Sequence, residues 1–444
     1  MDPNLSPSPG CGVAPAWWRR VPAWSELSTS TFRDVRWQLR NTVRTLDALQ
    51  QALGHQLPAR FLADAADGLA RSPMELRLTP HVVSLIDWSR PWADPVRRQF
   101  LPLGSEHEPD HPMARLDSLA ERRDTVLPGL VHRYPRKVLF LTLDVCPVYC
   151  RCCTRSYAVG SSTEAVTKGH LASGRSRLDQ VVDYLQAHPE VDDVVLSGGD
   201  TSLLPAGAVL EIGERLLGLG HIRRLRFGSK LMAVLPQRLL SDEPWLDALT
   251  RVAQLGHERG CEVALHTHVN HPRELTPHTR DAARALWERR VTMRNQSVLQ
   301  RGVNDDADTM LALLRGLARL HIQPYYVYNH DVVAGVECLR TTLRTAAELE
   351  KSVRGALTGF DTPTFVCDVV GGGGKRDLHS WELYDERLGL AIYRSPAVEP
   401  ERVYYAFDPL SQLEPAARRA WNEPGAPARL VQRAMERAGL GTSH

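Results

Sequence analysis

The chain has 444 residues, of which 43% are apolar and 24% are charged, enough for two or three domains or for one large α/β unit with extensions. Its formal charge of +2 argues against a protein that binds nucleic acid or membrane surfaces by bulk electrostatics. No apolar run approaches the roughly 18 residues of a membrane span, and the N-terminus lacks the basic start and apolar block of a secretion signal, so we expect a cytoplasmic protein.

The N-terminal part of the chain is expected to be mainly helical. Its opening segment is rich in Pro, Ser and Trp and is expected to be irregular, with Trp17 and Trp18 packing it on the surface. The pair Thr31 and Asp34 resembles a capping box. It predicts one amphipathic helix that continues to about Leu53.

Farther along, short apolar or β-branched runs alternate with stretches of helical periodicity. The expected strands span 138–143, 191–197, 223–229, 261–269, 292–299, 323–331 and 363–370. The expected helices span 174–187, 205–218, 242–258, 276–290, 305–320 and 344–355. Such alternation is typical of parallel βα units.

Six or seven strands are fewer than the eight of a closed barrel. The first strand also lacks the Gly-rich fingerprint of an open nucleotide-binding sheet. We therefore expect an α/β fold with a partial TIM-like (β/α)6 barrel, whose chemistry lies at the C-terminal ends of its strands.

A polar, Pro-bearing stretch at 103–123 is predicted to be a connection. It separates a helical N-terminal region, residues 1–122, from a barrel core over residues 123–345. The remaining residues, 346–444, form a C-terminal region and tail.

Four of the eight cysteines lie within eight positions, which indicates a metal or cofactor site rather than a disulfide framework. Cys146, Cys150 and Cys153 have CxxxCxxC spacing. Three thiolates on one loop suit a 4Fe-4S cluster with one iron left open for a small molecule. The alternative is a closed zinc site that includes Cys152. It is disfavoured because adjacent residues rarely direct both side chains at one metal.

The segment VVGGGGKRD is the second chemical signal. It is not a phosphate-binding P-loop, because Val369 and Arg376 stand where that motif needs Gly and Ser or Thr. Four glycines around Lys375 let the backbone approach a flat ligand closely. This arrangement suits a lysine that forms a Schiff base with an aldehyde cofactor.

With these motifs the sequence resembles the radical S-adenosylmethionine enzymes and, among them, the lysine 2,3-aminomutase family. The resemblance covers roughly residues 30–380. It is carried by HRYP (132–135), CPVYCRCCTR (146–155), LSGGD (196–200), LPQR (235–238), HVNHPRELT (268–276), NQSVLQRGVND (295–305), PYYVY (324–328) and PTFVCDVVGGGGK (363–375). The partial barrel would then be of the radical S-adenosylmethionine type.

The resemblance implies three cofactors: the 4Fe-4S cluster, S-adenosylmethionine and pyridoxal 5′-phosphate. Lys375 would carry pyridoxal phosphate as the catalytic lysine, while Arg133 and Tyr134 would hold its phosphate. Lys137 stands where the family has another arginine. The positive charge is kept, but the guanidinium group that can donate two parallel hydrogen bonds is lost. The residues implied to hold or face S-adenosylmethionine are Ser197, Gly198, Gly199, Asp200 and Gln296.

The substrate follows from charge. Arg155 matches the family's arginine for the α-carboxylate, and Asp331 and Asp368 match its acidic pair for the distal ammonium. Two carboxylates in one dry chamber favour a cationic side chain, so glutamate is rejected. The alternative is that either aspartate caps a helix or pairs with an arginine.

The implied reaction moves the α-amino group of free L-lysine from C2 to C3, giving β-lysine. Arginine is the alternative, because a guanidinium could bind both carboxylates and because Asn329 and His330 differ from lysine-specific members. A protein-linked lysine is a weaker alternative. So is a zinc protein without enzymatic activity that binds nucleic acid.

An external electron donor of the flavodoxin or ferredoxin type is also implied, with no nucleic-acid or membrane partner. The tail, residues 400–444, has no cysteine, so the intersubunit zinc of some family members should be absent. A homo-oligomer is left open.

Overall fold

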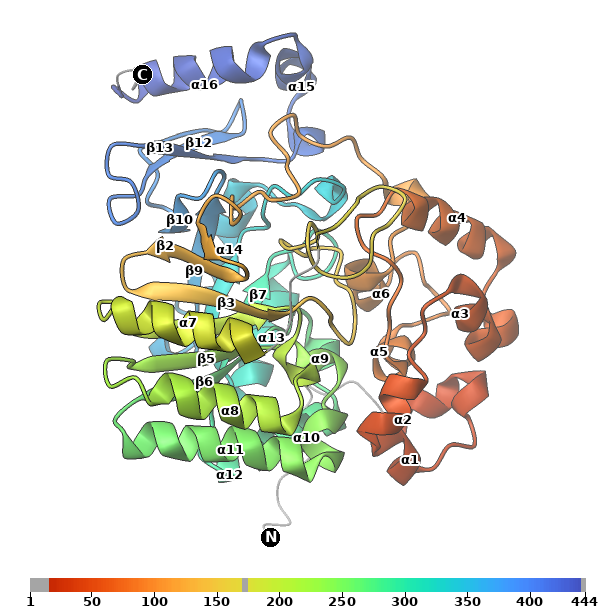
Figure 1. Ribbon diagram of the computed structural model, residues 1–444. Helices are drawn as coiled ribbons and strands as arrows, with labels where there is room; N and C mark the ends of the chain where they lie inside the picture. Colours follow the sequence, from red (N-terminus) through yellow and green to blue (C-terminus); the bar gives the residue numbers. More distant parts are fainter. Residues whose placement is uncertain (1–15, 170–174, 441–444) are drawn as a thin grey trace.

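The computed structural model describes residues 16–169 and 175–440. Its centre is a ten-stranded sheet in which the strands follow one another in chain order (Figure 1). These strands are β1 (Thr125–Leu127), β2 (Leu130–Tyr134), β3 (Lys137–Leu143), β4 (Asp193–Gly198), β5 (Arg224–Gly228), β6 (Glu262–Thr267), β7 (Thr292–Val298), β8 (Gln323–Tyr328), β9 (Thr364–Val369) and β10 (Gly374–Asp377).

The seven strands from β3 to β9 run parallel, and antiparallel strands extend the sheet at both edges. At one edge β1 and β2 precede β3, and at the other β10 pairs with β9. All seven predicted strands are therefore confirmed, as is the α/β class.

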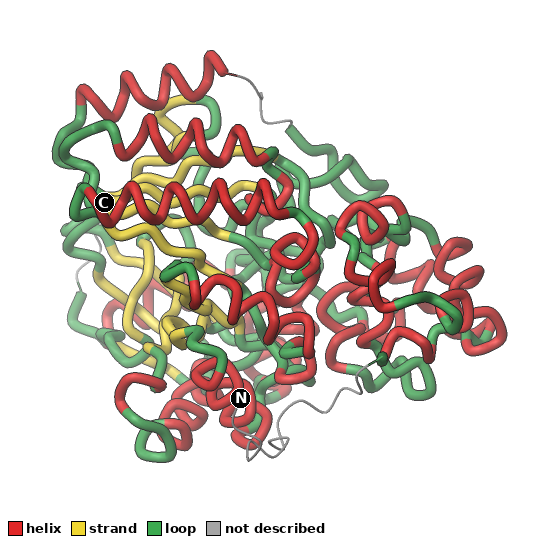
Figure 2. The backbone as a smooth tube through the Cα atoms, turned by 90° about the horizontal axis from the view of Figure 1, so that it is seen from below, coloured by secondary structure: helices red, strands yellow, loops and turns green. Residues whose placement is uncertain are grey.

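Each parallel pair is joined through at least one of the predicted helices. These are α7 (Arg175–Ala187), α8 (Ala206–Leu217), α11 (Glu243–Glu258), α12 (Pro277–Glu288), α13 (Ala307–Arg319) and α14 (Leu343–Val353), with the short α9 (Leu231–Val234) and α10 (Gln237–Ser241) before α11. Because the strand order never reverses and such crossovers are right-handed, these helices share one face of the sheet. Figure 2 shows the strands covered along one side by long helices.

The N-terminal region is helical, but its helices are short and lie beside the sheet (Figure 1). They are α1 (Thr29–Arg33), α2 (Val35–Arg40), α3 (Leu46–Leu53), α4 (Ala59–Ala70), α5 (Pro80–Leu85) and α6 (Pro95–Phe100). The prediction of one helix from Thr31 to Leu53 was wrong. Three helices lie there because Ser28, Asp34 and Thr45 each cap a new start with a side-chain oxygen.

Trp17 and Trp18 pack the opening segment onto the rest of the chain, as expected, and they do so from within the hydrophobic core. Their exposed fractions are 3% and 0%, and they lie in 3-10 helix η1 (Trp17–Arg20). Trp18 stacks on Phe32 with ring centroids 4.4 Å apart. Large aromatic surfaces are removed from water there, which ties the start of the described chain to the core.

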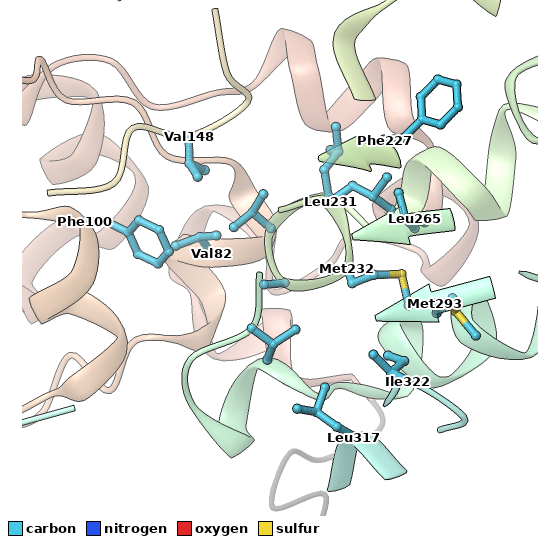
Figure 3. Close-up of a cluster of buried hydrophobic side chains, with 14 of the residues drawn as sticks. Val82, Phe100, Val148, Phe227, Leu231, Met232, Leu265, Met293, Leu317 and Ile322 are labelled. Carbon is cyan, nitrogen blue, oxygen red and sulfur yellow. The ribbon is translucent and has the colours of Figure 1, made fainter. Parts of the chain in front are cut away.

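The core between the N-terminal region and the strands is built around α9, which is entirely buried. Figure 3 shows Leu231 and Met232 of this helix next to Phe227, Leu265 and Met293 of the strands. The same figure places side chains of the N-terminal region, among them Val82 and Phe100, on the opposite side of α9. The helical region therefore closes over one end of the strands by apolar packing.

The C-terminal residues form a second, smaller layer (Figure 1). Strands β11 (Leu383–Asp385), β12 (Leu390–Arg394) and β13 (Val403–Phe407) make an antiparallel sheet, covered by α15 (Pro415–Asn422) and α16 (Ala426–Arg437). A bridge between Val370 and Tyr405 joins this layer to the end of β9. None of the helices in the described part of the chain has the length and apolar character to cross a membrane.

We expect the protein to lose stability as the pH falls from 6.5 to 4, because several histidines are buried uncharged. Burial lowers the pKa of His278 to about 4 and the pKa of His81 well below its usual value. The unfolded chain therefore binds more protons than the folded one in this range, so the free energy of unfolding falls with the pH. One such histidine contributes up to about 1.4 kcal/mol per pH unit.

Denaturant unfolding at several pH values between 4 and 7.5 measures this slope. In a His278→Asn variant the slope should be smaller than in the wild type by the contribution of one histidine, because asparagine does not titrate. Equal slopes would show that His278 does not contribute.

Candidate active site

One cavity with a volume of about 820 Å³ gathers nearly all of the predicted site residues. It is lined by the ends of neighbouring strands, by the cysteine loop after β3 and by part of the connection before β1. The predicted residues that line it are Arg133, Tyr134, Lys137, Cys146, Cys150, Cys153, Arg155, Ser197, Gly199, Asp200, Gln296, Asp331, Asp368 and Lys375. Gly198 does not.

Gly198 and Gly199 hold the cysteine loop against the end of β4. A Cβ atom at Gly198 would lie 2.4 Å from the carbonyl oxygen of Leu143, and one at Gly199 would lie 2.2 Å from that of Val145. Gly198 also has a φ of +99°, which favours glycine. These two glycines therefore let the backbone before Cys146 pack onto the sheet. Gly198 is covered by this packing and for that reason does not line the cavity.

The three thiols of the motif face the cavity, and burial raises the pKa of Cys153 to about 11. Cys152 is buried beside them, and its sulfur lies 3.5 Å from Nε2 of Gln300. Among residues 16–169 and 175–440, no three His, Cys, Asp or Glu side chains lie close enough to bind one metal ion. Neither the three motif cysteines nor a set that includes Cys152 is therefore preformed around one ion there, and both assignments stay predictions.

Asp200 and Gln296 are held by protein groups on the cavity wall. The Asp200 carboxylate accepts hydrogen bonds from the backbone N–H groups of Ser202, at 2.8 Å, and Lys230, at 2.7 Å. Gln296 Oε1 accepts from the Tyr328 hydroxyl at 2.6 Å, and its Nε2 lies 2.9 Å from Nδ1 of His266. Both side chains are thereby fixed before any ligand binds.

Lys375 lies in the hairpin of β9 and β10, directly opposite Asp368. Its Nζ is 3.5 Å from Oδ2 of Asp368 and 5.2 Å from the centre of the Tyr328 ring. Burial alone would lower the pKa of Lys375, but the Asp368 carboxylate and the nearby tyrosine hydroxyls together outweigh burial, and the pKa lies well above its usual value. Lys375 is therefore an ammonium ion when no ligand is bound.

Asp331 follows β8 and is the less satisfied member of the acidic pair. Its Oδ1 is buried and has no hydrogen-bond partner among the described residues. Burial, and next the nearby Asp368, raise the pKa of Asp331 well above its usual value. Asp368 pairs with a lysine and not with an arginine, and neither residue caps a helix in the described chain. Without a ligand the pair therefore has one cation, Lys375, for two carboxyl groups, and a second cation would favour the ionised form of Asp331.

The glycines before Lys375 make room for protein groups. A Cβ atom at Gly373 would lie 2.4 Å from the Tyr404 ring, and one at Gly374 would lie 2.2 Å from the Tyr134 hydroxyl. That hydroxyl accepts a hydrogen bond from the backbone N–H of Lys375 at 2.8 Å. Contacts within the chain therefore already require Gly373 and Gly374, and the approach of a flat ligand to this loop stays a prediction.

We expect Gly374→Ala to lower the free energy of unfolding by about 1–3 kcal/mol and to weaken pyridoxal phosphate binding. Gly374 has a φ of +76°, which strains any other residue, and the new methyl group would displace Tyr134 from Lys375. Denaturant unfolding and cofactor titration measure the two effects. Gly207→Ala is the matched control, because a Cβ there meets no atom within 4 Å. Equal behaviour of the two variants would contradict the expectation.

Arg133 and Lys137, the two basic residues predicted beside Tyr134, differ in their hydrogen-bond and ion-pair partners. Arg133 Nε donates to Asp124 at 2.6 Å, and Nη2 donates to the Leu119 carbonyl oxygen. Lys137 Nζ lies 3.9 Å from the centre of the Tyr134 ring. Burial, and next the charge of Lys375, lower the pKa of Lys137 to about 8. Arg133 is in an ion pair with Asp124, whereas none of the described carboxylates is in an ion pair with Lys137.

Arg155 is held by a residue that the sequence analysis did not single out. Its Nε and Nη2 donate to the two carboxylate oxygens of Glu121 at 2.9 and 2.7 Å. Its Nη1 lies 3.4 Å from Oγ of Ser197. Glu121 was missed because it lies in the polar stretch 103–123, where nothing in the local pattern separates it from solvent-exposed charges.

Comparisons with known proteins agree with these motifs. No family model matches the chain. The L-lysine 2,3-aminomutase of Clostridium subterminale is 36% identical over 360 residues, 80% of each chain. That of Fusobacterium nucleatum is 35% identical, over 79% of this chain and 77% of its own. The glutamate 2,3-aminomutase of Clostridioides difficile is more distant, 25% identical over 78% of this chain and 76% of its own.

Proposed function

This chain belongs to the lysine 2,3-aminomutase family, whose members are isomerases, and on that premise we propose that it converts free L-lysine to β-lysine with S-adenosylmethionine, a 4Fe-4S cluster and pyridoxal phosphate. The observation that carries the proposal is the content of one cavity. Its lining includes the three thiols of the motif, Lys375 and Arg155, together with two neighbouring carboxyl groups that share one cation, Lys375.

The donor set of the cysteine loop fits an iron–sulfur cluster better than it fits one ion. A cubane cluster holds its cysteine sulfurs farther apart than a single ion does, and the three half-buried thiols become thiolates when a metal binds. Cys146, Cys150 and Cys153 would hold the cluster, with one iron left for S-adenosylmethionine. When bound, the reduced cluster would supply the electron that starts radical chemistry, and it would receive that electron from an external donor of the flavodoxin or ferredoxin type.

The surroundings of Lys375 fit pyridoxal phosphate. Tyr134 and Lys137 present a hydroxyl and an ammonium to the cavity, and Arg133 adds a second cation beside them. When bound, the cofactor would hold the substrate nitrogen and stabilise an unpaired electron next to it. Lys375 must lose its proton before its amine can react, and Asp368 is the neighbouring carboxylate that can accept that proton.

The substrate is recognised by charge at its two ends. Arg155 would bind the α-carboxylate, while Asp331 and Asp368 would receive the distal ammonium. Once Asp368 has released to solvent the proton it took from Lys375, its carboxylate is free to pair with the distal ammonium in place of the Lys375 charge. An anionic side chain would leave three carboxylates together in a buried chamber, which disfavours glutamate.

The fold supports the same proposal. We take the parallel strands as an open, partial (β/α)6 barrel, since every crossover advances in the same direction and the predicted chemistry follows the carboxyl ends of β3, β4, β8 and β9. The proposed boundaries stay at residues 1–122, 123–345 and 346–444.

The decisive experiment is anaerobic turnover with dithionite and S-adenosylmethionine, with L-lysine, L-arginine or L-glutamate offered separately. β-Lysine is the expected product, identified by chromatography and mass spectrometry. If β-arginine were the only product, the proposed substrate would be L-arginine in place of L-lysine, and the proposed 2,3-aminomutase reaction would stand. A product from glutamate would contradict the role of the acidic pair, and no β-amino acid from any substrate would overturn the proposal.

A further inference from the structure

Residues 115–124 form a strap that crosses from the N-terminal region to the cavity. One end makes a β-bridge from Arg115 to Val333, two residues after Asp331. In the middle, the Ser118 carbonyl oxygen accepts from the backbone N–H of Gly371 at 3.0 Å. The strap therefore lies against both the acidic pair's loop and the glycine loop before Lys375.

Glu121 is the residue of the strap that reaches Arg155. Its side chain is 5% exposed. Its carboxylate accepts two hydrogen bonds from Arg155 and a third from the Tyr157 hydroxyl at 2.9 Å. Its own backbone N–H donates to Asp117 at 2.9 Å. Glu121 is thus held by its own segment and holds Arg155 in turn.

This pairing decides which edge of the guanidinium faces a ligand. Arginine usually binds a carboxylate with two parallel N–H groups. In Arg155 the edge formed by Nε and Nη2 is already used by Glu121, and Nη1 remains, near the Ser197 hydroxyl. Glu121 also neutralises Arg155, so a second carboxylate is attracted less strongly than it would be by an unpaired arginine.

We propose that Glu121 is a positioning residue for the aminomutase reaction: it fixes Arg155 so that the substrate α-carboxylate is received by Nη1 and by the Ser197 hydroxyl. The inference rests on the proposed function. The carboxylate is bound more weakly, but it is bound in one position only. The reacting β-carbon is thereby held at a fixed place relative to the radical source. Ser197 is thereby assigned to the substrate rather than to S-adenosylmethionine.

The test is Glu121→Gln in the fully loaded enzyme. Without Glu121 the Arg155 fork is free and more positive, so L-lysine should bind more tightly, about threefold in Kd by calorimetry. The carboxylate is then held in the wrong place, so kcat should fall by at least about tenfold. L-Lysinamide has no carboxylate, and its Kd should be the same for both proteins.

Two further variants make the result specific. Tyr157→Phe removes the third hydrogen bond to Glu121 and leaves Arg155 in place, so it should shift Kd and kcat in the same directions by less. Glu108→Gln is the matched control, because Glu108 lies in the same connection and pairs with Arg301 instead. It should behave as the wild type.

The outcomes separate this inference from the proposed function. Wild-type kcat and Kd in Glu121→Gln, or weaker binding of lysine and lysinamide alike, would overturn the inference while the aminomutase reaction stands. A Glu121→Gln protein that does not fold leaves the decision to Tyr157→Phe, whose unchanged constants would overturn it. A wild type that neither binds nor converts lysine would overturn both.

Discussion

Replacement of Lys375 by alanine is expected to remove the borohydride-trappable link to pyridoxal phosphate and to lower kcat by at least about a thousandfold. Lys375 is the one amine paired with Asp368 in the described cavity, and that carboxylate can take its proton when the amine reacts. Without the amine the cofactor has no covalent anchor. Peptide mapping after borohydride reduction identifies the labelled lysine.

The competing amine is Lys137, which lines the same cavity. Its pKa is lowered to about 8, so an appreciable fraction of it is a free amine at neutral pH. A link that survives in Lys375→Ala and disappears in Lys137→Ala would move the anchor to Lys137. Lys351→Ala is the control, because Lys351 is exposed on α14 and should keep full labelling.

Cys150→Ala should reduce iron and sulfide to background and abolish turnover, because three thiolates are the fewest that hold a cluster with one open iron. Iron analysis and electron paramagnetic resonance of anaerobically purified protein measure the loss. Cys152→Ala should keep both the iron and the cluster signal, although the two residues lie side by side in the loop. Normal iron in Cys150→Ala, or its loss in Cys152→Ala, would change the assignment of the ligands.

Most of the elements between β3 and β9 could be predicted from the sequence because their signals are local. A strand or helix buried on one side repeats its apolar residues at a fixed period, as in β7 and α13, whereas the short and fully buried α9 has no such period and was not predicted. The cysteine motif and Lys375 are also short-range patterns. Each of these motifs can be identified from neighbouring residues in the chain alone, without knowledge of the tertiary structure.

The errors occurred where a local signal had more than one outcome. Thr31 fits a helix start, but Ser28 precedes it and caps the helix first. That Trp17 and Trp18 pack the opening segment was expected, but their partners, among them Phe32 and the distant His278 of α12, were not. Whether an aromatic side chain is covered depends on surfaces that the flanking residues do not specify.

The sequence by itself determined the α/β class, the order of the parallel strands and the helices that join them, and the family to which the motifs point. Only the tertiary structure decided which charges meet: Lys375 with Asp368, Arg133 with Asp124, and Arg155 with Glu121 from the strap. It also decided that Gly374 makes room for Tyr134. Ion pairs and close packing join residues far apart in the chain, and their strength depends on burial and distance, which no local pattern contains.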